Sequence, residues 1–324
     1  MSAGMQAYAD ELAARLPLVA PDLRFVTLPR DRTLSVDEQI GLPRRLRAAG
    51  ANLVHFLSVY APLFAPRPYV VTIHDLIHLR FPKQFKPTVG PYYRTVVRAV
   101  CARAARVITD DERTIGDLER FLAVAPSKVR VVPLGVGAAY LEDGEADALR
   151  ASPPYFLYVG NHRPHKDLPT LFEAWEALPD ELAADLVITG RDDLGQARRP
   201  RRAAGALRFA GDVDLPALRE LYRDALALVS PSLCEGFGLP LLEAAALGTP
   251  VIASSEAIPG TLRPYVEAFA PRDVASLAGL MTRATRSFSR TQEARRFART
   301  QTWDRCAKGT AEVYREVLAE IERR

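Results

Sequence analysis

Residues 226–254 read L-A-L-V-S-P-S-L-C-E-G-F-G-L-P-L-L-E-A-A-A-L-G-T-P-V-I-A-S, and this stretch decides the fold. It begins with one short apolar run, L-A-L-V-S, and ends with another, V-I-A-S. Between them, Pro240 suits the first turn of a helix, because proline lacks the N–H group that would be unpaired there. Gly248 and Pro250 suit a helix end. The stretch therefore predicts a strand, a loop, a helix and a second strand, which is the repeating unit of a parallel sheet.

The same alternation of short apolar runs and helical spacing extends along the chain. The runs are continuously apolar, as expected when helices cover both faces of a parallel sheet. We therefore predict the α/β class, with two doubly wound, Rossmann-like domains facing each other across a cleft. The predicted strands are 23–27, 52–56, 69–73, 106–109, 128–132, 155–160, 185–190, 207–211, 226–230 and 251–254. The predicted helices include 92–105, 112–122 and others that begin near 168, 216 and 240.

Length and pattern predict where the domains lie. A chain of 324 residues is long for one hydrophobic core and suits two. We interpret residues 133–147 as the connection between the two domains, because they are acidic and lack periodicity. Their sequence is P-L-G-V-G-A-A-Y-L-E-D-G-E-A-D. We expect an N-terminal domain over residues 1–140 and a C-terminal domain over residues 150–302. Residues 303–324 complete the chain with an amphipathic helix.

Composition excludes several classes of protein. No apolar run approaches the roughly 20 residues that a membrane-spanning helix needs. The first residues lack the apolar core of a secretory signal. The net charge is +4, with 20 Lys and Arg against 16 Asp and Glu in residues 1–150, and 23 of each in the remainder. This excess is small and no aromatic residues are interleaved with it, so we expect no nucleic-acid partner. Three distant cysteines, Cys101, Cys234 and Cys306, predict free thiols in a reducing compartment, the cytoplasm.

Two carboxylates, Glu235 and Glu243, lie eight positions apart in the opening stretch. Glu235 falls at the carboxyl end of a strand, where parallel sheets bind ligands, and Glu243 is expected in the first turn of the next helix. Gly236 and Gly238 allow a ligand to approach the backbone, and the amides at a helix start bind anions. An anion site between two hydroxyl acceptors suits a sugar diphosphate. Two alternatives stay open, because such a glutamate can simply complement the helix dipole and Gly-Phe-Gly can form a tight turn.

Residues 235–243, E-G-F-G-L-P-L-L-E, resemble the signature of the retaining glycosyltransferases of the GT-B fold, specifically glycosyltransferase family 4. Other segments resemble the family in the same order, so the resemblance covers nearly the whole chain. It implies that the first domain binds the acceptor, that the second binds the nucleotide-sugar donor, and that the last helix crosses back to the first domain. These segments are V-T-I-H-D-L at 71–76, V-V-P-L-G-V at 131–136, L-Y-V-G-N-H-R-P-H-K-D-L at 157–168, and W-D-R-C-A-K-G-T-A-E-V-Y at 303–314.

The resemblance implies a nucleoside diphosphate sugar as the donor substrate, with no metal and no other cofactor. Lys166 takes the place of the diphosphate lysine of the family, and Arg163 is a second candidate cation. Asn161 stands where many relatives carry arginine. Gly4, in S-A-G-M-Q-A-Y, falls at the glycine-rich loop whose amides approach the donor phosphate. The expected catalytic residues are Glu235, His74 and Lys166, and the expected donor-binding residues are Gly4, Asn161, Arg163, Gly236, Phe237, Gly238, Leu239 and Glu243.

Histidines and paired acids need separate interpretation. His74 follows the predicted strand 69–73, and the family places a histidine there beside the transferred sugar, although a lone histidine is more often structural. His55 carries a weaker signal. We interpret His78, His162 and His165 as loop residues, and the pairs Asp110-Asp111 and Asp192-Asp193 as loop acids without a metal.

The sequence departs from the family at both ends of the predicted site. Met1 comes almost directly before the glycine-rich segment, where a strand normally precedes it. We expect either a start assigned too late or a first domain without its first strand. Residues 258–261, I-P-G-T, stand where relatives often show L-P-E-V, which predicts an unusual choice of donor.

The predicted function is that of a retaining hexosyltransferase in polysaccharide or glycolipid assembly. It would move a hexose such as mannose or rhamnose to the hydroxyl group of a saccharide or a lipid-linked acceptor. Peripheral contact with the inner face of the membrane is one interpretation of the basic helix after residue 92, and a solvated surface is the other. The arginines in question are Arg94, Arg98, Arg103 and Arg106. Two alternative functions stay open: a sugar-nucleotide epimerase of the same fold, and a degenerate transferase that acts as a binding partner.

Overall fold

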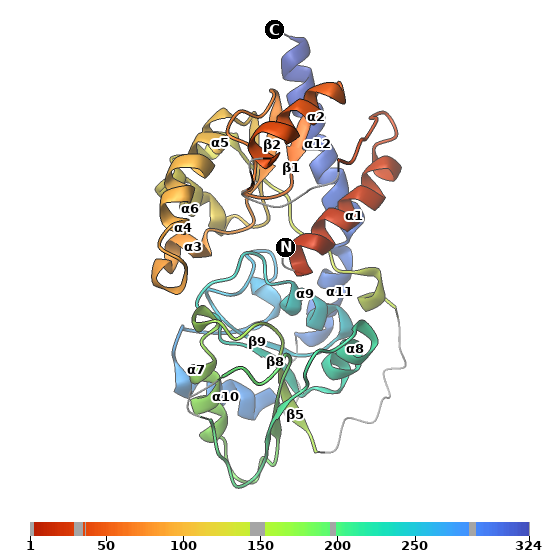
Figure 1. The fold of residues 1–324 in the computed structure, drawn as a ribbon. Coiled ribbons are helices and arrows are strands. Elements are labelled where there is room, and N and C mark those ends of the chain that lie inside the picture. The colour runs from red at the N-terminus through yellow and green to blue at the C-terminus, as the bar shows by residue number, and fades with distance from the viewer. Residues whose placement is uncertain are drawn as a thin grey trace. The chain divides into compact units, whose positions relative to one another are not determined.

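The computed structural model describes residues 3–28, 35, 37–142, 153–194, 199–284 and 290–323. The chain divides into two compact units: Met1–Gly135 with Gln301–Arg324, and Val136–Thr300. Each unit contains one parallel β-sheet with helices packed against it, which confirms the predicted α/β class (Figure 1). Residues 143–152, which include the predicted start of the second domain at 150, lie outside the described residues.

The sheet of the first unit has four parallel strands in chain order: β1 (Val54–Phe56), β2 (Tyr69–Thr72), β3 (Arg106–Thr109) and β4 (Val129–Val131). All four fall within predicted strands. The prediction of a strand at residues 23–27 is wrong, because these residues form none. Val26 is 54% exposed, and the ring of Phe25 lies against Tyr314 at a centroid distance of 6.4 Å. The segment thus packs on a helix through single side chains and pairs with no strand.

Helices cover the sheet of the first unit. Because the strand order follows the chain order, right-handed crossovers place the connecting helices on one face, and the other face needs a separate cover. The helix α12 (Trp303–Glu322) contacts β3 and packs against α1 (Ala3–Val19), so the end of the chain supplies that cover (Figure 1). The remaining helices of this unit are α2 (Leu42–Ala48), α3 (Ile77–Arg80), α4 (Val89–Tyr92), α5 (Arg98–Arg103) and α6 (Arg113–Leu122).

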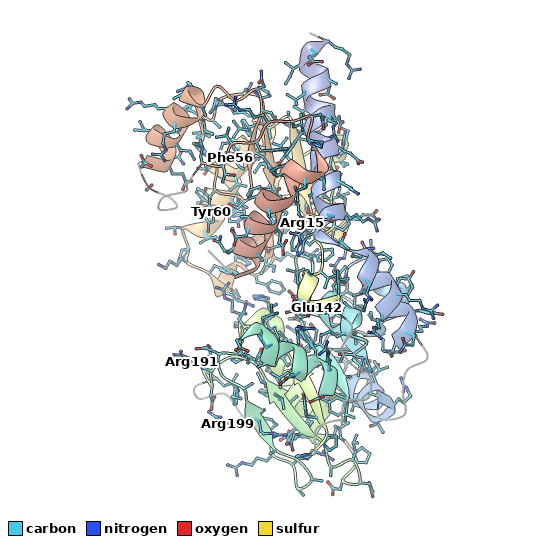
Figure 2. The ribbon with its side chains drawn as sticks, turned by 90° about the vertical axis from the view of Figure 1, so that its right-hand side faces the viewer. Arg15, Phe56, Tyr60, Glu142, Arg191 and Arg199 are labelled. Carbon is cyan, nitrogen blue, oxygen red and sulfur yellow. The ribbon has the colours of Figure 1, made fainter. Side chains whose placement is uncertain are left out.

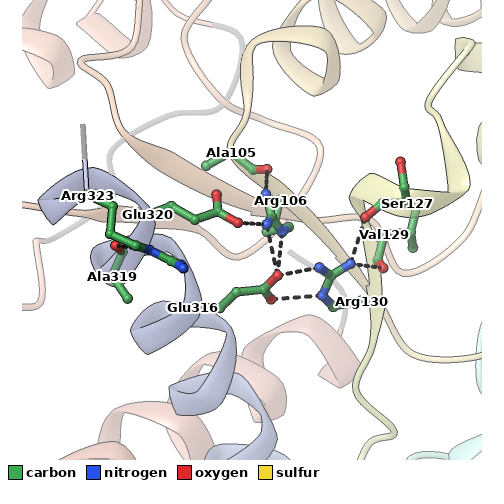
Figure 3. A network of polar contacts seen from close by, with 9 residues as sticks. All are labelled: Ala105, Arg106, Ser127, Val129, Arg130, Glu316, Ala319, Glu320 and Arg323. Atoms are coloured by element: carbon green, nitrogen blue, oxygen red, sulfur yellow. Dashed lines mark hydrogen bonds and ion pairs between the residues drawn. The ribbon is translucent and has the colours of Figure 1, made fainter.

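Apolar packing and a polar network attach these layers to the sheet. In the core, the ring of Phe56, which Figure 2 labels, lies 5.5 Å from that of Tyr69. Both side chains are buried. On α12, Glu316 accepts hydrogen bonds from Arg106 and from Arg130, each at 2.8 Å, and Glu320 also pairs with Arg106 (Figure 3). The hydrogen bond from Arg130, followed by that from Arg106, lowers the pKa of Glu316. The network therefore joins α12 to the strands β3 and β4.

The sheet of the second unit has six parallel strands. Its order is β10 (Glu267–Phe269), β9 (Val251–Ser254), β8 (Ala227–Ser230), β5 (Tyr155–Tyr158), β6 (Asp185–Ile188) and β7 (Leu207–Phe209). Five of these strands fall within predicted ones, whereas β10 was not predicted. Its three residues leave Ala268 exposed and form no apolar run. The helices are α7 (Leu168–Glu176), α8 (Leu215–Asp224), α9 (Leu239–Leu247), α10 (Val274–Ala284) and α11 (Thr291–Thr300).

The strand order of the second unit reverses between β5 and β8. The chain runs outward from β5 to β6 and β7, returns to β8 on the other side of β5, and continues outward to β9 and β10. The connections that leave β5 and β8 therefore diverge. In a parallel sheet this reversal opens a crevice at the carboxyl ends of the two central strands, which is the usual place for a ligand.

Two predictions about composition can be compared with the structure. Cys101, Cys234 and Cys306 are free thiols, as predicted, and all three are buried. Among the described residues, no helix has both the length and the apolar character needed to cross a bilayer.

Candidate functional site

The loop after β8 follows the predicted pattern. Glu235 lies in this loop, and Gly238 caps α9 with a left-handed backbone (φ 86°) that glycine adopts without strain. A Cβ atom at Gly238 would also lie 3.2 Å from the carbonyl oxygen of Ala257. Pro240 is the second residue of the helix, and Gly248 ends it with φ 81°. The strand, loop, helix and strand predicted for this stretch are confirmed.

The loops after β5 and β8 bring two predicted residues into contact. Lys166 ends the short helical turn Pro164–Lys166 after β5, and its Nζ lies 2.6 Å from Oε1 of Glu235. Ser232 Oγ donates to the same oxygen at 2.7 Å. Sequence separates the two charged residues by 69 positions. Their side chains are 13% and 15% exposed, so the ion pair is largely shielded but reachable by solvent.

The backbone holds these two loops together. The N–H group of Leu233 donates to the carbonyl oxygen of His165 at 2.8 Å, next to the ion pair. Asp167, directly after Lys166, has a left-handed backbone (φ 52°) that turns the chain into α7. Its carboxylate accepts from Thr170 Oγ1 at 2.7 Å, within the first turn of that helix. The position of Lys166 is thus fixed by its neighbours on both sides.

Other predicted donor residues of the second unit lie in the same two loops or at the start of α9. Asn161 follows β5, and its side-chain oxygen accepts from the N–H group of Arg163 at 3.2 Å. Both side chains are exposed. Gly236 is half-buried in the loop, whereas the ring of Phe237 is only 5% exposed and belongs to the core. Leu239 begins α9.

The prediction that Glu243 lies in the first turn of its helix is wrong. It is the fifth residue of α9, and its carboxylate accepts hydrogen bonds from Tyr222 at 2.9 Å and from Tyr140. Burial raises the pKa of Glu243 to about 7, although these tyrosines favour the ionised form. A carboxylate can accept about four hydrogen bonds, so two acceptor sites remain for a ligand.

The first unit holds the other predicted catalytic residue, His74. Its Nδ1 lies 2.7 Å from Oδ2 of Asp110, and its Nε2 lies 3.2 Å from the carbonyl oxygen of Leu57. The ring of Tyr8 packs edge-on against it at 4.7 Å. Leu57 follows β1, His74 itself follows β2 and Asp110 follows β3, so three neighbouring strand ends meet at the imidazole, and Tyr8 comes from α1. Both ring nitrogens face acceptors, an arrangement that only the doubly protonated imidazolium satisfies completely.

Charge balance at His74 agrees with this geometry. Burial by itself would lower the pKa of His74, but the charge of Asp110 and its hydrogen bond outweigh burial, and the pKa is raised. Burial also raises the pKa of Asp110, which is 2% exposed, against the opposing effect of His74. The pair therefore binds its protons more tightly in the folded protein than the free side chains would.

A second polar chain lies beside His74. His55 is bonded through Nδ1 to Tyr314 at 2.6 Å and through Nε2 to Thr72 Oγ1 at 2.7 Å, and Thr72 reaches Tyr8 at 3.1 Å. Burial, followed by the charge of His74, lowers the pKa of His55 to about 3, so this imidazole is neutral. His55 is therefore a structural residue that links β1 to α12.

The structure corrects further predictions. Gly4 lies in the first turn of α1, in the first unit, where a glycine-rich loop was expected. His78 lies in α3 and not in a loop, with its Nδ1 3.1 Å from Tyr93 Oη. The loop position predicted for His162 is confirmed, because it lies between β5 and the turn Pro164–Lys166, whereas the buried His165 belongs to that short helical turn and not to a loop.

The paired acids bind basic side chains. Asp111 pairs with Arg113 at 2.6 Å, Asp192 with Arg199 and Asp193 with His162. Within the described residues, no three His, Cys, Asp or Glu side chains are grouped as a metal site.

Three polar residues of these clusters were missed in the sequence. Ser232, Asp110 and Tyr222 all bind a predicted site residue directly. Ser232 and Asp110 each follow a predicted strand by one or two positions, so their place at a strand end was an available signal. Tyr222 lies on α8, and only the packing of α8 against α9 brings it to Glu243.

Two family descriptions match the chain. Residues 153–286 match Glycosyl transferases group 1, and residues 5–140 match Glycosyltransferase Family 4. O-antigen chain mannosyltransferase B of Escherichia coli is 26% identical over 84% of this chain and 77% of its own length. D-inositol 3-phosphate glycosyltransferase of Salinispora tropica is 33% identical over 68% of this chain and 53% of its own length. The chain thus spans between about half and three quarters of these relatives.

Solved structures show the same fold. HepE of Anabaena in complex with UDP-glucose has a TM-score of 0.68 at 16% identity, covering 88% of this chain and 84% of its own. WaaG, a glycosyltransferase involved in lipopolysaccharide biosynthesis, has a TM-score of 0.65 at 16% identity, covering 96% and 95%. Sucrose-phosphate synthase from Thermosynechococcus elongatus has a TM-score of 0.66 at 23% identity, covering 87% and 78%.

Proposed function

We propose that this chain, which belongs to glycosyltransferase family 4 and has the GT-B fold, transfers a hexose from a nucleoside diphosphate sugar to an acceptor hydroxyl. The observation that carries the proposal is the contact between Lys166 and Glu235 at the point where the strand order reverses. A cation for a diphosphate and a carboxylate for sugar hydroxyls lie side by side there. In the reaction, the bond between the sugar and the diphosphate breaks. The carboxylate can bind the sugar on one side of that bond, and the ammonium group can bind the diphosphate on the other.

Each charged group has a distinct role in the proposal. Lys166, with the amide groups near Gly236 and the start of α9, would bind the diphosphate and stabilise the charge that develops as it leaves. Glu235 would accept hydrogen bonds from the sugar and orient it. Glu243 has acceptor sites left beside its tyrosines, and we assign it to the ribose hydroxyls. A cationic side chain and backbone amides can supply this stabilisation without a metal ion.

The proposed reaction retains the configuration of the sugar. The bond between the anomeric carbon and the phosphate oxygen breaks, and the acceptor oxygen bonds to the same face of that carbon. The proton of the acceptor hydroxyl goes to the departing phosphate. In the first unit, His74 would act as an imidazolium held by Asp110, and a hydrogen bond from Nε2 to a sugar hydroxyl would replace its 3.2 Å contact with Leu57.

The relatives suggest the substrate class. Two matched proteins are named as O-antigen chain mannosyltransferases, and others as D-inositol 3-phosphate glycosyltransferases. We therefore propose a hexose such as mannose as the transferred sugar and a saccharide of cell-surface glycan assembly, free or lipid-linked, as the acceptor. Any membrane contact through the basic segment would use the exposed Arg94 and Arg98, because Arg106 is bound to Glu316 and Glu320.

Calorimetric titration tests the proposal. ADP, CDP, GDP, UDP and dTDP are titrated into the protein, and transfer is then measured with the sugar nucleotide of the base that binds. We expect one nucleotide to bind and Glu235→Ala to abolish transfer while nucleotide binding persists. Full transfer by Glu235→Ala, or no binding of any of the five nucleotides, would refute the proposal.

A further inference from the structure

Lys166 and Glu235 are bound to each other, although the proposed function requires both to bind the donor. Nζ of Lys166 lies 2.6 Å from Glu235 Oε1, and both side chains are less than one fifth exposed. Any ligand that takes the ammonium group for its phosphates must therefore separate the pair or share the lysine with it. The cost of that separation depends on what the ligand offers to the carboxylate in exchange.

We infer that the Lys166–Glu235 ion pair makes the site discriminate against the free nucleoside diphosphate in favour of the intact sugar nucleotide. This inference rests on the proposed function and names a specificity device within the same site. A sugar nucleotide brings hydroxyl donors that can replace the ammonium group at Glu235. A free diphosphate brings none, so the carboxylate would keep only the hydrogen bond from Ser232 in a shielded position.

Charge acts in the same direction. Release of the sugar exposes a terminal phosphate that carries one more ionisable oxygen than the sugar nucleotide does. Repulsion between like charges is strong where solvent screening is weak, and Glu235 is only 15% exposed. After transfer, Lys166 can return to Glu235 as the sugar leaves. The ion pair would therefore favour release of the spent nucleotide and binding of a fresh donor.

The test compares Kd values for a diphosphate and its sugar nucleotide by calorimetry, without acceptor. The probe pairs are ADP and ADP-glucose, GDP and GDP-mannose, UDP and UDP-glucose, and dTDP and dTDP-rhamnose, and the pair that the wild type binds is used. In Glu235→Gln, which has the same shape without the charge, we expect the Kd of the diphosphate to fall about fivefold, since no ion pair has to be broken. The Kd of the sugar nucleotide should rise about tenfold, since a charged acceptor is lost.

A matched control separates this effect from a general change in charge. Glu142, also in the second unit, pairs with Arg219 at 2.9 Å and is 66% exposed (Figure 2). Glu142→Gln removes the same charge and breaks an ion pair, and we expect both Kd values to stay within about twofold of the wild type.

A double variant connects the effect to the lysine. In Lys166→Met both ligands should bind more weakly, and adding Glu235→Gln should no longer tighten binding of the diphosphate, because no ammonium group is left to release. An unchanged or raised Kd for the diphosphate in Glu235→Gln alone would overturn the inference. It would mean that Lys166 binds the carboxylate and the phosphate at the same time. If the wild type binds none of the five nucleoside diphosphates and none of the four sugar nucleotides, the proposed function fails as well.

Discussion

In both units, ionisable residues lie at the carboxyl ends of the strands, but their solvent exposure and the strand order around them differ. In the first unit the four strands follow chain order, and His74 and Asp110 bind each other in a nearly closed polar cluster. In the second unit the order reverses, and Lys166 and Glu235 pair in a position that solvent reaches. We propose that ionisable residues at strand ends are available to a ligand where the topology separates the loops. Where the strands follow chain order, the same residue types bind one another and stabilise the sheet, and His74 would reach a sugar hydroxyl only by giving up its contact with Leu57.

The largest effect is expected when the Lys166–Glu235 pair of the second unit is broken. Lys166→Met should lower the rate of transfer by about 100- to 1,000-fold, because the departing diphosphate loses its cation. Initial rates with the sugar nucleotide identified by calorimetry measure this. Lys308→Met, at an exposed position of α12, removes the same charge and should leave the rate unchanged. If the rate in Lys166→Met fell by less than about tenfold, the Lys166–Glu235 pair would, like the His74–Asp110 pair, mainly stabilise the fold.

The corresponding change in the first unit should act on folding. Asp110→Asn leaves a buried imidazolium without its carboxylate and should lower the free energy of unfolding by about 3–5 kcal/mol. Asp22→Asn is the control, because its ion pair with Arg315 is exposed and screened by solvent. Denaturant unfolding monitored by a signal from the first unit measures both. Equal stabilities of the two variants would contradict a structural role for Asp110.

The His74–Asp110 pair also predicts how the stability of the protein depends on pH. The pKa of His74 is raised in the folded state, so its contribution to stability is complete below the pKa of the unfolded side chain, about 6.5, and is lost as the pH rises through the folded value. The raised pKa of Asp110 acts in the same direction. Wild-type stability should therefore fall above pH 6.5, and Asp110→Asn should reduce this fall. A steeper fall in the variant would contradict the assignment.

A smaller effect is expected at Glu243 in the second unit. Its pKa is about 7 in the folded state against 4.5 for the free side chain, so the folded protein binds the proton more tightly and stability declines as the pH rises from 4.5 to 7. Glu243→Gln should remove this decline and raise stability at pH 8 by about 3 kcal/mol. Melting temperatures of both proteins at pH 5 and pH 8 test this. Parallel pH profiles would show that the carboxyl group does not titrate in this range.

The smallest effect concerns the backbone beside Glu235. Gly238→Ala forces a left-handed conformation on a residue with a Cβ atom and should cost about 1 kcal/mol. Gly116→Ala, within α6 and with open space around its Cα, should instead stabilise the first unit by about 0.5–1 kcal/mol. Thermal unfolding distinguishes the two. A neutral Gly238→Ala would mean that the loop can adopt another conformation.

Much of the fold was predictable because its strands are apolar runs bounded by glycine, proline and helical spacing. The strand β10 was not predictable, since its three residues are held by pairing with β9 and not by any apolar pattern of their own. Residues 23–27 showed the opposite error. They contain aromatic and β-branched residues, as strands do, but no neighbouring strand pairs with them.

The site was predictable as a set of residues and not as a set of contacts. Glu235 and Lys166 could each be placed at a strand end from local sequence. Their contact depends on β5 lying beside β8, and a local pattern does not determine strand order. The tyrosines that bind Glu243 come from elements that reach it only through packing of the folded unit. Asp110 was taken for a loop acid because its partner, His74, is 36 positions away.

A crystal structure of the protein with the nucleoside diphosphate selected by calorimetry tests the central claim most directly. The account predicts phosphate oxygens within about 3 Å of Lys166 Nζ, at the carboxyl ends of β5 and β8, with the lysine drawn away from Glu235. A diphosphate bound at any other place, with the Lys166–Glu235 contact unchanged at 2.6 Å, would contradict it.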